Sequence, residues 1–506
     1  MKNSLETYQH IASLSKEIKL LSSIDMLLEW DKETYMPKDG ILLRSMQKEY
    51  LATLIHDKKT SEEFKAALQQ LIDLKNGTIL ANDLDEPKQA ALKQWRKDFL
   101  NHTKLPSKFV SDFAKITTEA AHVWSDAKNN NAFDLFSPHL EKVVSNCRQM
   151  AEYLGYKEHP YDALLDLYEP GMTKGHLNSL FEKIKPFLIR LLHSLKDFSP
   201  RRDFLSFSYE EDKQLKFARS LLNDMGLTEN FCRIDLSSHP FCMGLHPKDL
   251  RITTHVQSSN IMANILAHLH EGGHGLYEAG LPESEFGTPL GEAVSLGIHE
   301  SQSRLWETMI GHGLPFWKYY YPKLQKTFPE SLQEVSLQEF YDAINLVAPS
   351  FIRVFADEVT YCLHVILRYE IELQLIEGNL LVKDVPKAWN TKMLDMFGMT
   401  PSSDTMGCLQ DIHWSLGAIG YFPTYALGNI YAGQIFQKIQ QDFADWEKRL
   451  ENGDLKFITQ WLFENIYKYG KQFSPTELIQ KATGKHLSPE PYMEYLANKY
   501  QSLIKQ

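Results

Sequence analysis

The stretch HLHEGGHGLYEAG, residues 268–280, holds the side chains best suited to catalysis. His270 and His274 are four residues apart, so on an α-helix they project from one face about one turn apart and can bind the same metal ion. Glu271, beside the first histidine, can take a proton from water on that metal without being a ligand. The spacing therefore predicts a metal centre that activates water for hydrolysis.

A third metal ligand is expected further along the chain. Catalytic zinc commonly binds three protein ligands, and two histidines with one glutamate are a frequent set. Glu300, within GEAVSLGIHESQSRLWE (291–307), is the candidate. The alternative is that Glu300 pairs with Arg304, four residues later on the same helical face. The upstream histidines favour the ligand, with zinc as the first choice of metal and cobalt or manganese as alternatives.

Two further histidines lie beside this set. His268 precedes His270 by two residues, about 200° around a helix, so we expect it to be packed or exposed and not to share the metal. His299 directly precedes the proposed glutamate ligand, and we expect it to support a ligand instead of binding the ion.

The adjacent glycines Gly272 and Gly273 need an explanation, because each weakens a helix by about 1 kcal/mol relative to alanine. We expect that they allow another helix or a substrate backbone to come close. The alternative is a simple kink. Metal binding at the neighbouring histidines can offset the cost to the helix.

The sequence also predicts the elements that carry these side chains. Ser258–Asn260 are suitable N-caps for a helix with apolar residues at helical spacing, and Gly280 followed by Pro282 predicts its end. Thr288–Pro289 predicts the start of a second helix, which extends to about Gly311 or Gly313 and carries Glu300 near its middle. Upstream, RIDL and LRITTHV within residues 233–256 are rich in β-branched residues and flank the turn-forming HPFCMGLHPKD, which predicts a small antiparallel hairpin.

The remaining chain has the features of a large helical globular protein. Residues 1–195 show helical spacing throughout, and the polar segment 196–214 is the best candidate for a junction between two lobes. The formal charge is -11 and no basic stripe is present, so nucleic acid is not an expected partner. No apolar stretch reaches the length of a membrane span or of a signal peptide core. Five scattered cysteines without a CxxC pair indicate free thiols and a cytoplasmic protein.

The sequence resembles the thermostable carboxypeptidase (carboxypeptidase Taq) family of zinc metallocarboxypeptidases, almost from end to end. The resemblance is carried by short stretches in a fixed order. They are LEWDKETYMP (28–37), YDALLDLYEPGMT (161–173), HPF (239–241), DLRITT (249–254), HEGGH (270–274), HESQ (299–302), IRVFAD (352–357), GCLQDIHW (407–414) and GYFPTY (420–425). One departure is Phe355, where many relatives have an acidic residue, and it puts the local pairing of that segment in doubt.

The resemblance implies a mostly α-helical fold. The expected architecture is a two-lobed shell around a deep substrate groove, with a small antiparallel β-sheet beside the HExxH helix. A helical lobe of residues 1–195 would cover the groove, residues 196–506 would form the catalytic lobe, and the two would be parts of one continuous fold. The family commonly forms homodimers, so a homodimer acting on peptides is expected.

The resemblance also implies residue roles. His270, His274 and Glu300 match the metal ligands and Glu271 the general base. A further group matches positions that hold the C-terminal end of the substrate or stabilise the reacting carbonyl, or that line the groove. The first are Arg353, His413 and Tyr421, and those lining the groove are His239 and Arg251. The backbone of an exposed strand edge can bind an extended peptide regardless of its side chains, which would place the last two beside the substrate and permit broad specificity.

The implied reaction is hydrolysis of the C-terminal peptide bond, releasing one amino acid at a time. Arginine suits this because its planar guanidinium binds a carboxylate with two parallel hydrogen bonds. Arg353 has an alternative partner in Asp357, four residues later, and His413 and Tyr421 could instead be packed core residues. Two alternative functions are a zinc endopeptidase or oligopeptidase of similar helical fold, and a helical binding protein without activity.

Overall fold

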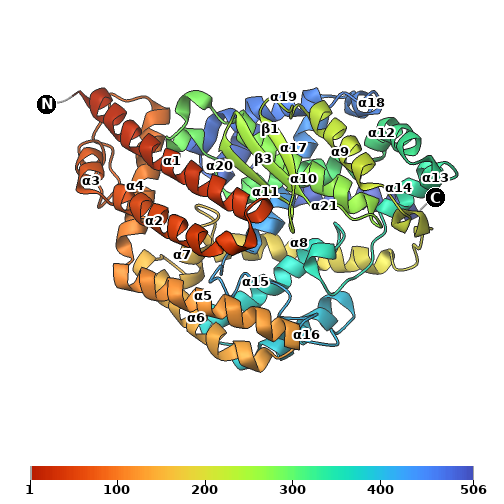
Figure 1. Cartoon of the computed structure of the whole chain (residues 1–506), viewed down its shortest axis with the longest axis horizontal. Coiled ribbons are helices and arrows are strands. Elements are labelled where there is room, and N and C mark those ends of the chain that lie inside the picture. Colours follow the sequence, from red (N-terminus) through yellow and green to blue (C-terminus); the bar gives the residue numbers. More distant parts are fainter. Residues whose placement is uncertain (1–2, 505–506) are drawn as a thin grey trace.

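The computed structural model of the chain describes residues 3–504 and is mostly helical, as predicted (Figure 1). The helices before the sheet are α1 (Ser4–Thr34), α2 (Ile41–Lys59), α3 (Glu62–Gln69), α4 (Glu86–Lys104), α5 (Ser107–Asn130), α6 (Phe133–Leu154), α7 (Pro160–Leu165), α8 (Lys174–Ser194) and α9 (Glu211–Met225). Those after it are α10 (Ile261–Gly280), α11 (Leu296–Arg304), α12 (Leu314–Thr327), α13 (Pro329–Leu332), α14 (Leu337–Ile344), α15 (Tyr361–Glu377), α16 (Val385–Phe397), α17 (Pro423–Asp442), α18 (Trp446–Glu451), α19 (Lys456–Asn465), α20 (Pro475–Thr483) and α21 (Glu490–Ile504). None of the described helices is long and apolar enough to cross a membrane.

The buried apolar side chains form two clusters. The smaller cluster joins α1, α3 and α4 through residues such as Tyr8, Phe64 and Trp95, and Leu290 contributes to it from the segment between α10 and α11. The larger cluster contains buried residues from Ala120 in α5 to Leu503 in α21. Helices α5 to α8 therefore share a core with the helices that follow the sheet, while the predicted division at residue 195 stays a prediction.

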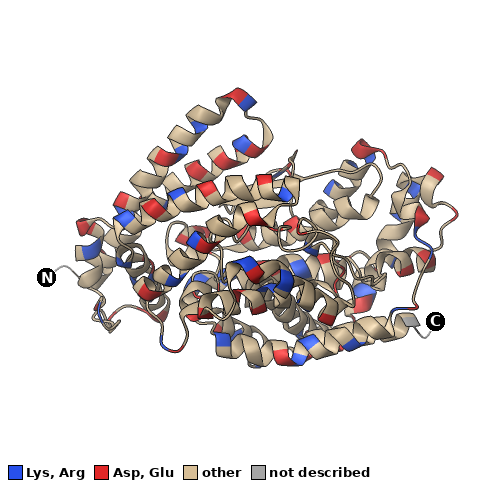
Figure 2. Cartoon of the chain, turned by 90° about the horizontal axis from the view of Figure 1, so that it is seen from below, with Lys and Arg blue, Asp and Glu red and all other residues tan. Residues whose placement is uncertain are grey.

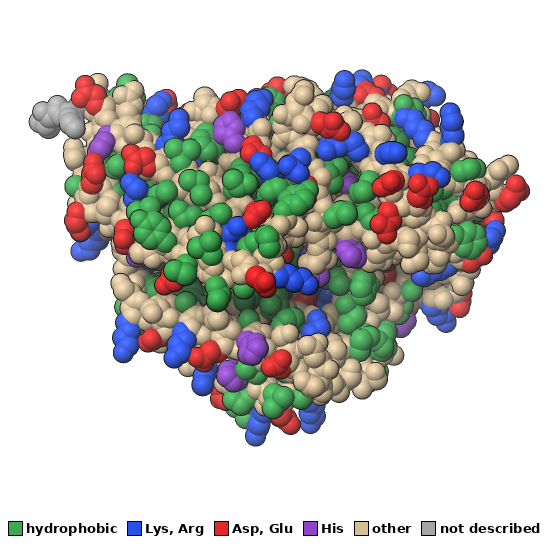
Figure 3. Space-filling model, viewed as in Figure 1, with side chains coloured by type: hydrophobic (Ala, Val, Ile, Leu, Met, Phe, Trp, Pro, Cys, Tyr) green, Lys and Arg blue, Asp and Glu red, His purple; other side chains and the backbone are tan. Residues whose placement is uncertain are grey.

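Helices α1 and α2 form an antiparallel pair on one side of the molecule (Figure 1). Figure 2, seen from below, shows this pair projecting from the body of the chain with acidic and basic residues interspersed along it. Ion pairs join the two helices, with Lys48 Nζ 2.9 Å from Asp25 and Arg44 Nη2 2.7 Å from Asp31. In Figure 3 the surface beneath this pair is hollowed, between it and the part that contains α5 and α16.

The sheet has three strands, β1 (Cys232–Leu236), β2 (Phe241–His246) and β3 (Asp249–Thr254), in the order β1-β3-β2. The prediction of a purely antiparallel sheet was wrong. The two predicted strands, β1 and β3, pair in parallel, and the segment predicted as a turn contains β2, which pairs antiparallel with β3. The chain turns once between β1 and β2 and again between β2 and β3. In the sheet, β3 therefore lies between β1 and β2.

The two faces of the sheet contact different helices. Ile252 and Cys242 face α10, where they lie close to Gly275. Arg251 points to the opposite face, where its guanidinium lies 4.7 Å from the ring centre of Trp30 in α1. The sheet is therefore enclosed between the predicted metal-binding helix and the first helix of the chain.

Helix α10 has the predicted bounds, but the next helix begins later than predicted. Asn260 accepts a hydrogen bond from Ala263 N as the N-cap, and the helix ends at Gly280 as expected. Gly280 does not have the left-handed conformation; a side chain there would collide with Tyr467. Thr288–Pro289 starts only the short 3₁₀ turn Pro289–Gly291, and α11 begins after the N-cap Ser295. The helix then continues as a π-helical segment, Leu305–Ile310.

The adjacent glycines Gly272 and Gly273 in α10 provide close contacts with neighbouring helices, and the helix continues through them. A Cβ atom at Gly273 would lie 2.5 Å from the carbonyl oxygen of Gln302 in α11. One at Gly272 would lie 2.5 Å from Leu222 in α9. The expected approach of another helix is thus what these positions provide, and a kink is not needed to explain them.

We expect Gly273→Ala to destabilise the fold by about 1–3 kcal/mol, because the new methyl group meets the backbone of α11 and not a flexible side chain. Denaturant unfolding of metal-free protein measures this change. Gly175→Ala in α8 is the control, since its methyl group would meet only Thr173 Oγ1 at 3.7 Å; the control should gain up to about 1 kcal/mol. Equal stability of Gly273→Ala and wild type would contradict the close-contact explanation.

Candidate active site

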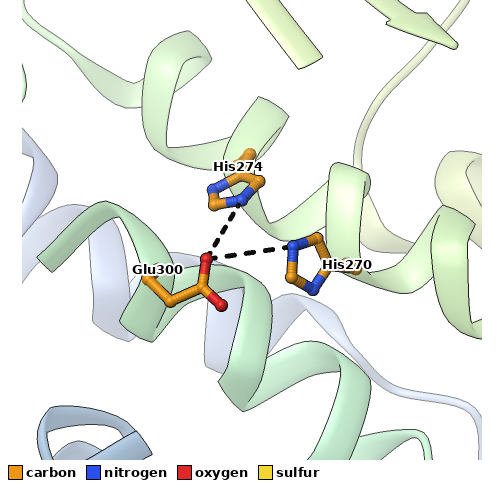
Figure 4. A group of neighbouring side chains, drawn as sticks. All are labelled: His270, His274 and Glu300. Carbon is orange, nitrogen blue, oxygen red and sulfur yellow. Dashed lines mark ion pairs between the residues drawn. The ribbon is translucent and has the colours of Figure 1, made fainter. Parts of the chain in front are cut away.

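Three predicted ligands converge between α10 and α11 (Figure 4). His270 and His274 point from one face of α10 toward Glu300, whose Oε2 lies 3.9 Å from Nε2 of the first and 3.7 Å from Nε2 of the second. One ligand atom from each residue lies within 4.8 Å of the other two. Two imidazoles and one carboxylate at these separations fit a divalent ion with positions left for water or substrate.

The outer nitrogen of His270 is bound to Glu307. His270 Nδ1 donates to Glu307 Oε2 over 2.8 Å, and Arg304 Nη1 donates to the same oxygen over 2.7 Å. Arg304 also donates to Asn429, so its hydrogen bonds go to these partners and not to Glu300 as in the alternative interpretation. With the proton on Nδ1, the lone pair of His270 Nε2 faces the ligand cluster.

Burial and neighbouring charge set the protonation of these groups in opposite ways. Burial lowers the pKa of His270, but Glu300 and Glu307 outweigh burial and raise it to about 9. For Glu307, burial raises the pKa, but Arg304 and His270 outweigh burial and lower it to about 2. Burial raises the pKa of Glu271 to about 7. A group with a pKa near neutrality suits a residue that must both accept and release a proton.

Helix α11 is held in place at its start and along one side. Glu169 accepts from Gly297 N over 2.9 Å and from Tyr431 of α17 over 2.7 Å. A Cβ atom at Gly428, also in α17, would lie 2.5 Å from Glu300 Cγ. The backbones of α10 and α17 therefore contact α11 on two sides, and this contact fixes where the Glu300 carboxylate lies.

His268 and His299 have the positions expected for residues that do not bind the ion. His268 is buried, and its Nδ1 lies 2.8 Å from the carbonyl oxygen of Asn264 in the same helix. His299 Nδ1 lies 2.6 Å from His274 Nδ1, on the side of that imidazole away from Glu300.

A second cluster forms around Arg353, which is 5% exposed. Its Nε and Nη2 donate to Asp411 Oδ1 over 3.2 and 2.9 Å, and its Nη1 donates to Tyr361 over 3.0 Å. Arg368 donates to the other oxygen of Asp411 over 2.7 Å. The partner of Arg353 is therefore Asp411, while Asp357 accepts from the backbone of its own loop.

This cluster has more positive than negative charge. Burial alone would raise the pKa of Asp411, but the guanidinium groups of Arg368 and Arg353 outweigh burial and hold it well below its usual range. Two guanidinium groups thus share one carboxylate in a buried place. A single negative charge from outside would balance the cluster, and Arg353 still has N–H groups that are free of Asp411 and Tyr361.

His413 and Tyr421 lie beside this cluster. Their ring centres are 5.2 Å apart, and His413 Nε2 lies 3.4 Å from the Tyr425 hydroxyl. Burial lowers the pKa of His413 to about 4, so the imidazole is neutral at pH 7. Tyr361 connects the cluster to the metal ligands, because its hydroxyl accepts from Arg353 while Arg304 lies 4.7 Å from its ring centre.

Comparison with known proteins agrees with this geometry. Residues 10–500 match the model of the family described as carboxypeptidase Taq (M32) metallopeptidase. The chain belongs to this family. It is a metal-dependent carboxypeptidase, a peptide hydrolase that removes the C-terminal residue of peptides, and the endopeptidase alternative has no support among its relatives.

Relatives of this carboxypeptidase match it over nearly their full length. Carboxypeptidase 1 of Bacillus subtilis is 38% identical, with 99% of each chain covered. Thermostable carboxypeptidase 1 of Thermus thermophilus is also 38% identical, with 98% of each chain covered. The crystal structure of an M32 carboxypeptidase from Deinococcus radiodurans has a TM-score of 0.96 and 34% identity, with 99% of this chain and 100% of that chain covered.

In this carboxypeptidase the hydrogen bonds of the predicted groove residues His239 and Arg251 go to residues outside both clusters. His239 is exposed in the connection between β1 and β2. Arg251 pairs with Asp249 over 2.6 Å and lies against Trp30 of α1. The departure at Phe355 is harmless to Arg353, because Phe355 is 77% exposed and the arginine has partners elsewhere.

Several partners in the M32 site were not predicted from the sequence. Glu307 is seven residues after Glu300, which places it on the same side of a helix and is a usable signal. Asp411 lies two residues before His413 within a stretch already singled out. Glu372, which accepts from Tyr161, Trp414 and Gly420 and so anchors the loop that carries His413, has no local signal.

Proposed function

We propose that His270, His274 and Glu300 hold one divalent metal ion in this carboxypeptidase, with zinc as the native metal. The proposal is supported by the convergence of their ligand atoms and by the donor set, which zinc favours over metals that prefer oxygen ligands. When bound, the ion acts as a Lewis acid toward water and the scissile carbonyl. The residues around it supply the remaining steps.

Glu271 is the general base in this proposal. It follows His270 directly in α10, and a carboxylate at this position can take the proton of the attacking water and later give it to the leaving amine. Tyr421 and His413 are proposed as donors to the developing oxyanion or to the end of the substrate. The neutral imidazole of His413 suits a donor that must not repel the arginine beside it.

Arg353 is proposed to bind the terminal carboxylate of the substrate, and the observation that carries this assignment is the excess positive charge of the buried cluster. Tyr361 lies between this cluster and Arg304 beside the metal ligands. The cluster recognises the end of the chain and no particular side chain, which supports broad specificity. Arg251 and His239 are proposed to bind substrate residues further upstream, along the sheet.

Arg353→Gln should lower kcat/KM for a peptide with a free C-terminus by about 100-fold, mainly through KM, because a buried charge-assisted pair is lost. Wild type should release little from the same peptide with an amidated C-terminus, and the variant should discriminate much less between the two. Release of amino acids over time measures both. Arg201→Gln, at an exposed position, is the control. Efficient cleavage of the amidated peptide by wild type would contradict the proposed role of the cluster.

Glu271→Gln should reduce kcat by roughly 10²- to 10⁴-fold, because the amide cannot accept the proton of water. Metal content should stay unchanged, since the three proposed ligands remain. Elemental analysis and single-turnover cleavage check both expectations. Wild-type activity in this variant would overturn the assignment of the base and would revive the alternative of a binding protein.

A homodimer is also proposed, with the α1–α2 pair at its interface. On α2 the side chains of Leu42, Met46 and Tyr50 follow one helical stripe and are 77%, 66% and 71% exposed. Leu20 and Ile24 form a corresponding exposed stripe on α1. Hydrophobic side chains gather over this region in Figure 3. Exposed apolar side chains that gather on one helical pair in this way are typical of an interaction surface.

The double variant Leu42→Glu with Met46→Glu should be a monomer at concentrations where wild type is a dimer, because four charges would face one another across a two-fold interface. Sedimentation velocity at several concentrations measures the change. Leu394→Glu, at an exposed position of α16, should leave the mass unchanged. A dimer that withstands the double variant would place the interface elsewhere.

Cytoplasmic localisation is proposed from the cysteines. All five are free, and four of them are buried, which agrees with a reducing compartment.

A further inference from the structure

A contact between two imidazoles lies next to the proposed metal site. His299 Nδ1 and His274 Nδ1 are 2.6 Å apart, and their ring centres are 4.5 Å apart. Two nitrogens at this distance form a hydrogen bond only if one carries a proton and the other has a lone pair. His299 Nε2, on the far side of the ring, lies 2.9 Å from Glu278 Oε1.

One arrangement of protons satisfies all three groups. His274 needs a lone pair on Nε2 to bind a metal, so its proton must be on Nδ1, from which it donates to His299 Nδ1. The proton of His299 is then on Nε2 and donates to Glu278, because a carboxylate can only accept. In the opposite tautomer of His299, an N–H group would face the N–H group of His274 and a lone pair would face the carboxylate.

The position of Glu278 is fixed by the elements around it. Glu278 is one turn beyond His274 in α10, and His299 comes from α11, so the contact passes from one helix to the next and back. Gly244 of β2 leaves space for the carboxylate, since a Cβ atom there would lie 2.5 Å from Glu278 Oε2. The strand thus approaches closely enough to confine the carboxylate beside His299.

The two proposed histidine ligands are supported differently. His270 donates directly to Glu307, which also binds the buried Arg304. The outer nitrogen of His274, Nδ1, contacts His299, and His299 in turn contacts the Glu278 carboxylate. Removing the charge of Glu307 would leave Arg304 without its ion-pair partner and disturb the fold, whereas Glu278 binds His299 on a partly exposed side. Glu278 therefore allows a cleaner test.

We propose that Glu278 is a positioning residue that acts through His299 to fix the tautomer and orientation of His274 for metal binding. This inference rests on the proposed metal site. A glutamine at position 278 can either donate or accept, so it no longer selects one tautomer of His299. His274 then loses the acceptor that holds its proton on Nδ1.

Glu278→Gln should weaken zinc affinity by about 10- to 100-fold, the usual effect of removing an outer partner of a metal-binding histidine. Competition with a fluorescent chelator measures the affinity of the full chain. Nitrogen-15 spectra of zinc-loaded protein should show one tautomer of His299 in wild type and a mixture in the variant. Unfolding of metal-free protein should be unchanged. Glu283→Gln, at an exposed position a few residues later, is the matched control.

A double-mutant cycle separates this role from a general structural one. If Glu278 acts through His299, adding Glu278→Gln to His299→Asn should cause no further loss of zinc affinity. A full additional loss in the double variant, or unchanged affinity and one tautomer in Glu278→Gln, would overturn the proposal. If zinc did not change the His274 signals of wild type, the metal site itself would be wrong, an outcome that is distinct from both.

Discussion

The close contact of α11 with its two neighbouring helices is the constraint on which the proposed site depends. Gly273 of α10 faces the backbone of α11, and Gly428 of α17 faces Glu300 from the other side. Helices normally pack 8–10 Å apart, with side chains between them, and glycine permits a closer approach. The carboxylate can therefore reach both imidazoles of the neighbouring helix without an extended, mobile side chain, so the geometry of the three proposed ligands is set mainly by backbone positions.

The charges divide the site into two parts, one around the proposed metal ligands and one around Arg353. Around the proposed metal ligands lie three carboxylates, Glu271, Glu300 and Glu307, and one guanidinium, Arg304, which leaves two negative charges when these four are ionised and the ligand histidines are neutral, as metal binding requires. A divalent cation balances them. Around Arg353 one positive charge is left over, which a terminal carboxylate balances. Unpaired buried charge is costly, so each half of the site favours a ligand of opposite sign.

The sequence predicted the residues whose relation is local, and it missed those that depend on tertiary contacts. The two histidines and the proposed base share one helical turn, so their arrangement follows from helix geometry, and Glu300 was predicted as the third ligand because the next predicted helix follows directly along the chain. For Arg353 the local candidate was Asp357, but the observed partner is Asp411, which the fold brings from a distant loop.

The prediction of the sheet was wrong for the same reason. β1 and β3 have the composition of strands, but their pairing direction depends on β2, whose sequence is typical of a turn. Thr288–Pro289 is a strong helix start in sequence, yet Ser295 caps α11, whose start is held by Glu169 from more than a hundred residues away.

In the proposed site, the separation of the metal ligands from Arg353 explains how an exopeptidase can use a motif that many endopeptidases share. The proposed metal ligands and the proposed base Glu271 would act on any peptide bond and do not distinguish the last bond from the others. Arg353 is buried and hydrogen-bonded to Asp411 and Tyr361. If it moved aside for a substrate that extends further, Asp411 would lose one of its two arginine partners. Tyr361 packs against Arg304, which is bound through Glu307 to His270. The spacing between the proposed metal ligands and Arg353 is therefore held by a continuous series of contacts, which suits the removal of a single C-terminal residue.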